Sequence, residues 1–306
     1  MSEFNLRSAA SYAGLILMMA VTSLLAILLI GPVKAAGLGA FEDPDSILNA
    51  FLFIFAMLVI TAVLLILIKW KAQQVISVII GFSLAAVIYY VVMALLRQAG
   101  LGILADAGGV ICGIGIIVLL WLYPEWYVIN TAGILVAAGC AAIFGVSLSL
   151  LPVLVLLVLL MVYDFIAVKR SKHMLTLADG VLRQKMPIMF LVPKTKGYSY
   201  RKSGFSIRNE KGERGAYMIG MGDVIMPAIL VVSAQVFAGG EGVMSVFGIY
   251  LPALGALIGG IVGLLILMIP VNTGKPQPGL PLINGCAIIG FFLCCLIAGS
   301  WDWLVW

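Results

Sequence analysis

The sequence has little charge and almost no histidine. Only 10% of its 306 residues are Asp, Glu, Lys or Arg, and His173 is the single histidine. Soluble domains carry about 25% charged and about 45–50% apolar residues, whereas 63% of this chain is hydrophobic. The composition argues against a soluble enzyme, a nucleic-acid-binding domain and a disordered chain. One histidine argues against a histidine-based metal site and a serine–histidine dyad, so we expect no metal and no cofactor.

Long apolar runs take up most of the chain instead. A helix needs roughly 20 apolar residues to cross about 30 Å of hydrocarbon, and nine runs meet this length. The sequence therefore predicts an all-α polytopic membrane protein with nine transmembrane helices. The predicted spans are 9–30, 47–68, 75–96, 103–123, 127–145, 150–168, 217–238, 243–269 and 279–300.

The Lys and Arg residues predict the orientation of these spans. Sixteen of the 18 lie in segments on the N-terminal side of the membrane, and only Lys34 and Arg97 lie on the other. The positive-inside rule then predicts a cytoplasmic N-terminus and an outside C-terminus in a multi-pass protein of the cell membrane. The net charge of +5 reflects this bias and attraction to membrane lipid, and it requires no nucleic-acid partner.

This topology predicts three parts. Residues 1–168 hold helices 1–6, residues 169–216 form a polar cytoplasmic loop, and residues 217–306 hold helices 7–9. Within the loop, 173–184 has helical character, the apolar run 186–193 is bounded by prolines and predicts a strand, and 198–208 predicts a hairpin. In the eighth span, Gly255, Gly259 and Gly263 have a spacing that predicts close packing against a neighbouring helix.

Two acidic residues lie well inside predicted spans, Asp164 in the sixth and Asp223 in the seventh. Acids within a membrane are costly and mark candidate functional sites. At 1.5 Å per residue, both lie about 7–9 Å inside the cytoplasmic boundary, so their equal depth allows them to meet. Asp106 lies near the outer start of the fourth span, where we expect a solvated or helix-capping role.

The segment Pro278-Gly279-Leu280-Pro281 opens the last span at the same level. Two prolines so close together predict an irregular start with free main-chain groups. Such backbone is tolerated at membrane depth only within protein or beside a wet cavity. Gly220 and Gly222, just before Asp223, allow a close approach of the main chain.

Two carboxyl groups in this setting would have a defined chemistry. At about 4 Å and an effective dielectric constant of about 20, two carboxylates repel by roughly 4 kcal/mol. The pair would therefore hold one shared proton and titrate as a unit. This is the arrangement of aspartic proteases, in which the ionised member removes a proton from water and the protonated member polarises the scissile carbonyl.

At these residues the sequence resembles the presenilin and signal peptide peptidase family of intramembrane aspartyl proteases, and most closely the archaeal-type presenilin homologues. The matching motifs are Tyr163-Asp164, Gly220-Met221-Gly222-Asp223 and Pro278-Gly279-Leu280-Pro281, in that order. The resemblance implies that Asp164 and Asp223 are the catalytic pair. It also implies that the other motif residues shape the site, and that the substrates are transmembrane segments. Gly279 departs from the alanine that the family usually carries.

A transmembrane helix hides its peptide bonds in its own hydrogen bonds, so a substrate must unwind before attack. We hypothesise that the unwound segment adds as a β-strand. The candidate partners are residues 190–192, the chain just before Tyr217, and the main chain at Leu280.

Two alternatives remain at this point. A proton or cation transporter or channel could use the intramembrane acids, although it does not account for the Pro-Gly-Leu-Pro segment, and no inverted repeat is found. A prepilin-type peptidase resembles the chain at Gly-x-Gly-Asp, but its other aspartate usually lies in a cytosolic segment.

Overall fold

The computed structural model describes residues 6–168, 189–193, 199–200, 216–240, 242–271 and 277–304. Nine long helices lie in these ranges, together with the short α2 (Ile30–Ala35) and a 3-10 turn at Asp302–Leu304. The long helices are α1 (Leu6–Leu28), α3 (Leu48–Lys69), α4 (Gln73–Gln98), α5 (Ile103–Leu122), α6 (Trp126–Ser147), α7 (Leu150–Ile166), α10 (Met221–Phe237), α11 (Leu251–Val271) and α12 (Leu280–Ala298).

The described part of the chain holds seven candidate membrane spans, the first of which runs through α1 and α2. Two further apolar helices, α7 and α10, have only 17 residues each. These two short helices carry Asp164 and Asp223.

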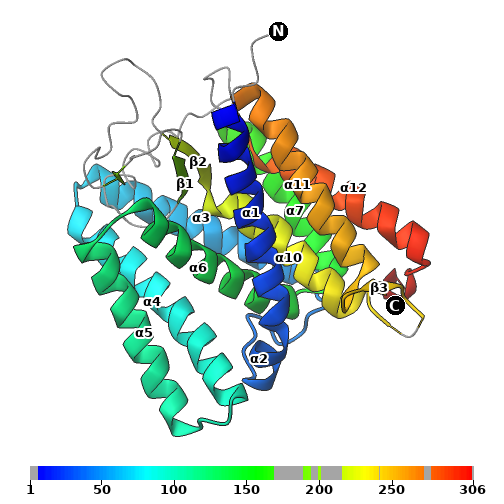
Figure 1. The fold of residues 1–306 in the computed structure, drawn as a ribbon, viewed down its shortest axis with the longest axis horizontal. Coiled ribbons are helices and arrows are strands. Elements are labelled where there is room, and N and C mark those ends of the chain that lie inside the picture. The colour runs from blue at the N-terminus through cyan, green and yellow to red at the C-terminus, as the bar shows by residue number, and fades with distance from the viewer. Residues whose placement is uncertain are drawn as a thin grey trace.

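Helix α10 lies at the centre of the bundle, where it packs against α1, α6, α7, α11 and α12. Residues 228–234 of this helix are buried on every side, as expected for a helix with apolar residues on all its faces. In contrast, α4 and α5 pair with each other at one side of the molecule (Figure 1). The second of the two acid-bearing helices is therefore held from several directions.

Glycines bring α11 and α12 close together, as predicted. A Cβ added at Gly255 would strike the Gly290 carbonyl oxygen, and one at Gly259 would strike the Cys286 carbonyl oxygen. At Gly263 it would lie 2.6 Å from the Leu282 carbonyl oxygen. The backbones can approach this closely only without side chains, and the contact holds α12 against α11.

A two-stranded antiparallel sheet precedes α10. It pairs β1 (Met189–Pro193) with β2 (Ala216–Gly220), and Leu191 lies opposite Met218. The strand predicted within 186–193 is confirmed over its described part. The helix predicted at 173–184 and most of the hairpin predicted at 198–208 lie outside the described residues.

The predicted starts of the seventh and eighth spans are wrong. Residues 217–220 belong to β2, because Gly220 is extended (φ −61°, ψ 139°) and β1 supplies a pairing partner. The segment before α11 forms a hairpin of β3 (Ser245–Val246) and β4 (Ile249–Tyr250). Its turn residues, Phe247 and Gly248, have positive φ angles of 51° and 79°, which a two-residue hairpin turn requires.

The start of α1 and the end of α12 lie at opposite ends of the bundle. The start of α1 lies at the same end as β1 and β2, while the end of α12 lies at the end that carries β3 (Figure 1). The first residues of α10 therefore lie at the end of the molecule that also carries the start of α1.

Candidate active site

Asp164 is the third-last residue of α7 and is only 3% exposed. Its carboxylate oxygen Oδ2 accepts a hydrogen bond of 3.1 Å from the main-chain N–H of Leu280. Leu280 is the first residue of α12, so its N–H has no partner within the helix. The positive end of a helix dipole also stabilises a nearby negative charge. The start of α12 thus provides Asp164 with a favourable polar contact in an apolar bundle.

Asp223 is the third residue of α10 and is half-buried. Its carboxyl group lies against Gly279, since a Cβ added there would lie 3.0 Å from Oδ2, 3.1 Å from Cγ and 3.2 Å from Oδ1. A Cβ added at Gly220 would lie 3.4 Å from the same Oδ2. Glycine at position 279 therefore leaves the room that this carboxyl group occupies.

The two acids converge on consecutive residues of α12, Leu280 for Asp164 and Gly279 for Asp223. Both acids therefore approach the start of one helix, as the prediction that they meet requires, while their depth in the membrane stays a prediction. Both acids lie nearer to their helix ends than predicted, about 3 Å along the axis, because α10 begins only at Met221 and α7 ends at Ile166.

The Pro278-Gly279-Leu280-Pro281 segment is more regular than predicted. Gly279 has helical angles (φ −81°, ψ −45°), and Leu280 and Pro281 already belong to α12. Proline is accepted there because the first helical N–H groups have no intrahelical partner. The prediction of an irregular start is wrong for these residues. Of the main-chain groups predicted to be free, the Leu280 N–H lacks a partner in its helix and bonds to Asp164, whereas the Gly279 carbonyl accepts from the Ile283 N–H of α12.

The remaining motif residues differ in their surroundings. Met221 is buried at 7% exposure, whereas Gly222 is exposed, and a Cβ added there would meet nothing within 4 Å. Tyr163 is half-buried beside Asp164, and its role stays a prediction. Pro227 lies four residues after Asp223 in α10, so the N–H that would bond to the Asp223 carbonyl is missing.

Side chains from α6 and α1 close the outer edge of β1. The Asn130 amide nitrogen donates to the Leu191 carbonyl at 2.7 Å, and the Leu191 N–H donates to the Asn130 oxygen at 2.8 Å. The Ser11 hydroxyl donates to the Pro193 carbonyl at 3.1 Å. Since proline has no N–H, it offers no donor to a further strand.

The same alternation leaves the far edge of β2 without a pairing strand among the described residues. In an antiparallel pair, the residues that do not bond across the pair direct both main-chain groups outward. Leu191 bonds to Asn130 through both of its main-chain groups, so it does not bond across the sheet to Met218, the residue opposite it in β2. Met218 therefore directs its own N–H and carbonyl away from β1. Gly220 follows two positions later, three residues before Asp223. The far edge of β2 therefore leads directly to the second acid.

Asn130 was not singled out from the sequence, although a signal exists. It is a polar amide inside an otherwise apolar predicted span, and such side chains usually bond to another part of a membrane protein. A search for charged residues inside the predicted spans does not find it, because the amide is neutral. Its partner, Leu191, carries no signal, because only its main chain takes part.

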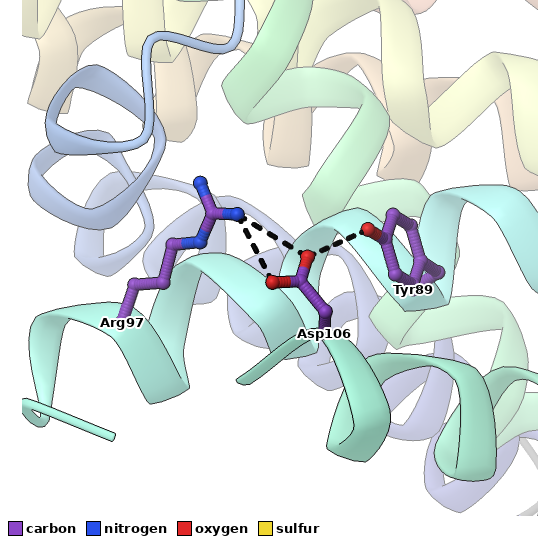
Figure 2. Close-up of polar contacts among 3 residues, drawn as sticks. All are labelled: Tyr89, Arg97 and Asp106. Carbon is purple, nitrogen blue, oxygen red and sulfur yellow. Dashed lines mark hydrogen bonds and ion pairs between the residues drawn. The ribbon is translucent and has the colours of Figure 1, made fainter. Parts of the chain in front are cut away.

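Asp106 lies away from this site, in the first turn of α5. Figure 2 shows its carboxylate between Tyr89 and Arg97. The Tyr89 hydroxyl donates to Oδ1 at 2.9 Å, and Arg97 donates to both oxygens at 3.2 Å. Its side chain and that of Arg97 are both nearly half-exposed, at 45% and 46%. Asp106 therefore links α4 to α5 and is partly exposed to solvent, as expected, but no side-chain hydrogen bond caps the start of α5.

Within the described ranges, no group of three or more His, Cys, Asp and Glu side chains could hold a metal ion. The ionisable groups at the start of α12 are the carboxyl groups of Asp164 and Asp223. Together, the fold and these acids define a multi-pass helical membrane protein with two carboxyl groups brought to one helix start.

Comparison with known proteins identifies the family. The model of the family described as signal-peptide peptidase, presenilin aspartyl protease matches residues 15–300. The chain belongs to this family of intramembrane aspartyl proteases.

Two solved structures are similar over nearly the whole chain. A presenilin family intramembrane aspartate protease in space group C222 is 40% identical, covers 94% of this chain and 99% of its own, and has a TM-score of 0.69. A presenilin family intramembrane aspartate protease in space group P2 is 42% identical, covers 93% of this chain and 97% of its own, and has a TM-score of 0.68. No curated protein matches the chain.

Proposed function

We propose that this protein is an intramembrane aspartic endopeptidase of the GxGD type, with Asp164 and Asp223 as its catalytic pair. The observation that supports this most is the convergence of both carboxyl groups on Gly279 and Leu280. Family membership supports proteolysis, and the two motif aspartates are the acids that meet at one helix start.

In this mechanism the two acids act in different protonation states. One carboxylate removes a proton from a water molecule, and the protonated carboxyl donates a hydrogen bond to the scissile carbonyl. Water attacks the carbonyl carbon, and the proton then passes to the leaving amine as the peptide bond breaks. Asp164 is the more buried of the two and accepts the Leu280 N–H, whereas Asp223 is half-buried and lies next to the exposed Gly222. The Gly222 side is thus the route by which water and substrate reach the pair.

The substrates are peptide bonds in or near transmembrane segments, which must reach the pair in an unwound form. Of the three candidate partners for such a segment, the structure favours β2, which begins just before Tyr217 at Ala216. The chain before Ala216 lies outside the described residues. The outer edge of β1 is occupied by Asn130 and Ser11, and the Leu280 N–H already bonds to Asp164. A substrate strand on β2 would place its peptide bonds beside Asp223.

For the membrane topology we propose nine spans in the cell membrane, with α7 and α10 as the two shortest. Seventeen residues are at the lower limit for a spanning helix. An N-terminus in the cytoplasm follows from the Lys and Arg distribution, and so do the three parts 1–168, 169–216 and 217–306. The short length of α7 and α10 brings the ends that carry Asp164 and Asp223 near the membrane boundary, where water is available.

The test is direct. Purified protein in detergent is incubated with a synthetic transmembrane peptide, with and without an aspartic-protease transition-state inhibitor. We expect cleavage products by mass spectrometry that the inhibitor removes. Proton or cation flux into proteoliposomes without any proteolysis would instead favour the transporter alternative.

A further inference from the structure

A single side chain of α6 takes the place that a third strand would have beside β1. Asn130 gives one hydrogen bond to Leu191 and accepts one from it, at 2.7 and 2.8 Å. This is the pattern by which two strands bond at one residue of an antiparallel ladder. Both residues are 4% exposed. Only one orientation of the amide satisfies both groups of Leu191, so the side chain and the strand fix each other.

The same helix holds the neighbouring parts of the loop. A Cβ added at Gly133 would lie 2.9 Å from the ring of Phe190, so the glycine makes room for this fully buried side chain. Glu125, just before α6, accepts hydrogen bonds from the Ser199 hydroxyl at 2.7 Å and the Tyr200 N–H at 3.2 Å. The position of β1 is therefore set by α6, not by the loop alone.

The position of β2 follows from that of β1 through their register. Leu191 pairs with Met218, and Met189 pairs with Gly220. A shift of β1 along α6 would carry β2 with it, and β2 continues without a break into α10 and Asp223. If β1 rotated so that Leu191 lost its bonds to Asn130, the outer edge of β1 would also become free. A substrate strand could then pair with β1 instead of β2.

We infer that Asn130 is a positioning residue for proteolysis. Its amide closes β1 and holds the Met218 edge of β2 at a fixed register relative to Asp223, so that one peptide bond of an added substrate strand faces the two acids. This inference deepens the proposed function and rests on it. It assigns to Asn130 the choice of cleavage position, which a residue with a purely structural role would not control.

The test compares Asn130→Leu with the wild type and with Thr131→Val. Leucine has a similar size and removes both hydrogen bonds. Thr131 is the matched control, because it is the next residue of α6, is exposed, and bonds only to the Tyr127 carbonyl of its own helix. The substrates are one transmembrane peptide and a set of analogues, each with a single backbone amide near the scissile bond replaced by an ester.

For the wild type and Thr131→Val we expect one main cleavage position. We also expect the effect of the ester to alternate with its position in the substrate. At every second position the single ester removes one main-chain hydrogen bond to the far edge of β2 and lowers kcat/KM by about fivefold. For Asn130→Leu we expect cleavage spread over neighbouring bonds, a KM about tenfold higher with kcat nearly unchanged, and loss of the ester pattern. Binding of a small inhibitor at the acid pair should remain as in the wild type.

Ser11→Ala is the second variant, for the case that Asn130→Leu does not fold. It removes the hydrogen bond to the Pro193 carbonyl and leaves both hydrogen bonds of Asn130 in place, so we expect the same change of cleavage position to a smaller extent. An unchanged cleavage position and ester pattern in every folded variant would overturn this inference alone. A wild type that cleaves no transmembrane peptide and binds no inhibitor would overturn the proposed function as well.

Discussion

The carboxyl group of Asp223 occupies the space that a side chain would fill at Gly279. A Cβ at this position would lie 3.0–3.2 Å from all three carboxyl atoms, and Gly279 itself has helical angles that any residue can adopt. The glycine is therefore not required by the backbone, and a methyl group in its place would require the Asp223 carboxyl group to move by a few tenths of an ångström. The next residue, Leu280, bonds to Asp164, so the start of α12 sets the relative placement of both acids.

We expect Gly279→Ala to lower the cleavage rate by about 2- to 10-fold and Gly279→Val to lower it by at least about 100-fold. A methyl group displaces the Asp223 carboxyl group by a few tenths of an ångström, and a misplacement of about 1 Å can cost about 100-fold. Initial rates on a transmembrane peptide measure this. Gly285→Ala is the control on the same helix, because its Cβ would meet only the flexible end of Met161 at 3.6 Å. Equal rates for Gly279→Val and the wild type would contradict this account.

Gly259→Ala should destabilise the protein by about 1–3 kcal/mol, since its Cβ would meet main-chain atoms of Cys286 and Ala287 in α12. The helices can accept it only by separating. Gly115→Ala in α5 is the matched control, because its Cβ would meet nothing within 4 Å, and alanine favours a helix by up to about 1 kcal/mol over glycine. Thermal unfolding in detergent should therefore show opposite shifts for the two variants. Shifts of the same sign would argue against the glycine contact.

Asn284 is fully buried in α12, one turn after Leu280, and neither its amide oxygen nor its nitrogen has a hydrogen-bond partner among the described residues. An unsatisfied buried polar group costs about 1–3 kcal/mol. We expect Asn284→Leu to raise the thermal unfolding temperature, while Asn284→Ala, which leaves a cavity, should lower it. A lower unfolding temperature for the leucine variant would indicate that the amide holds a polar partner such as a buried water.

Much of the fold could be predicted from apolar runs alone. The nine long helices fall within a few residues of the predicted runs in most cases, because helices are the usual way for such runs to satisfy their main chain in a membrane. The Gly255, Gly259 and Gly263 spacing predicted close packing, and α12 provides it. The two acids could be selected because charge inside a membrane is rare and costly.

The strands next to the helices could not be predicted in the same way. Hydropathy does not distinguish a short apolar strand from the first turn of an apolar helix, so residues 217–220 and 243–250 were assigned to spans. The turn at Phe247 and Gly248 was also not recognisable, since a bulky residue with positive φ is uncommon. The bond between Asn130 and Leu191 joins a side chain to a main chain 61 residues away, and no local pattern reports such a contact.

The most direct test of the account compares three single variants, Asp164→Asn, Asp223→Asn and Asp106→Asn, in cleavage of one transmembrane peptide by folded, purified protein. Asp106 is the matched acid, because it too lies in a predicted span but bonds to Tyr89 and Arg97 away from the site. We predict no detectable cleavage for the first two variants and, for Asp106→Asn, a rate within about twofold of the wild type, as a partly exposed ion pair contributes little. Robust cleavage by either Asp164→Asn or Asp223→Asn would contradict the central claim that these two carboxyl groups act together.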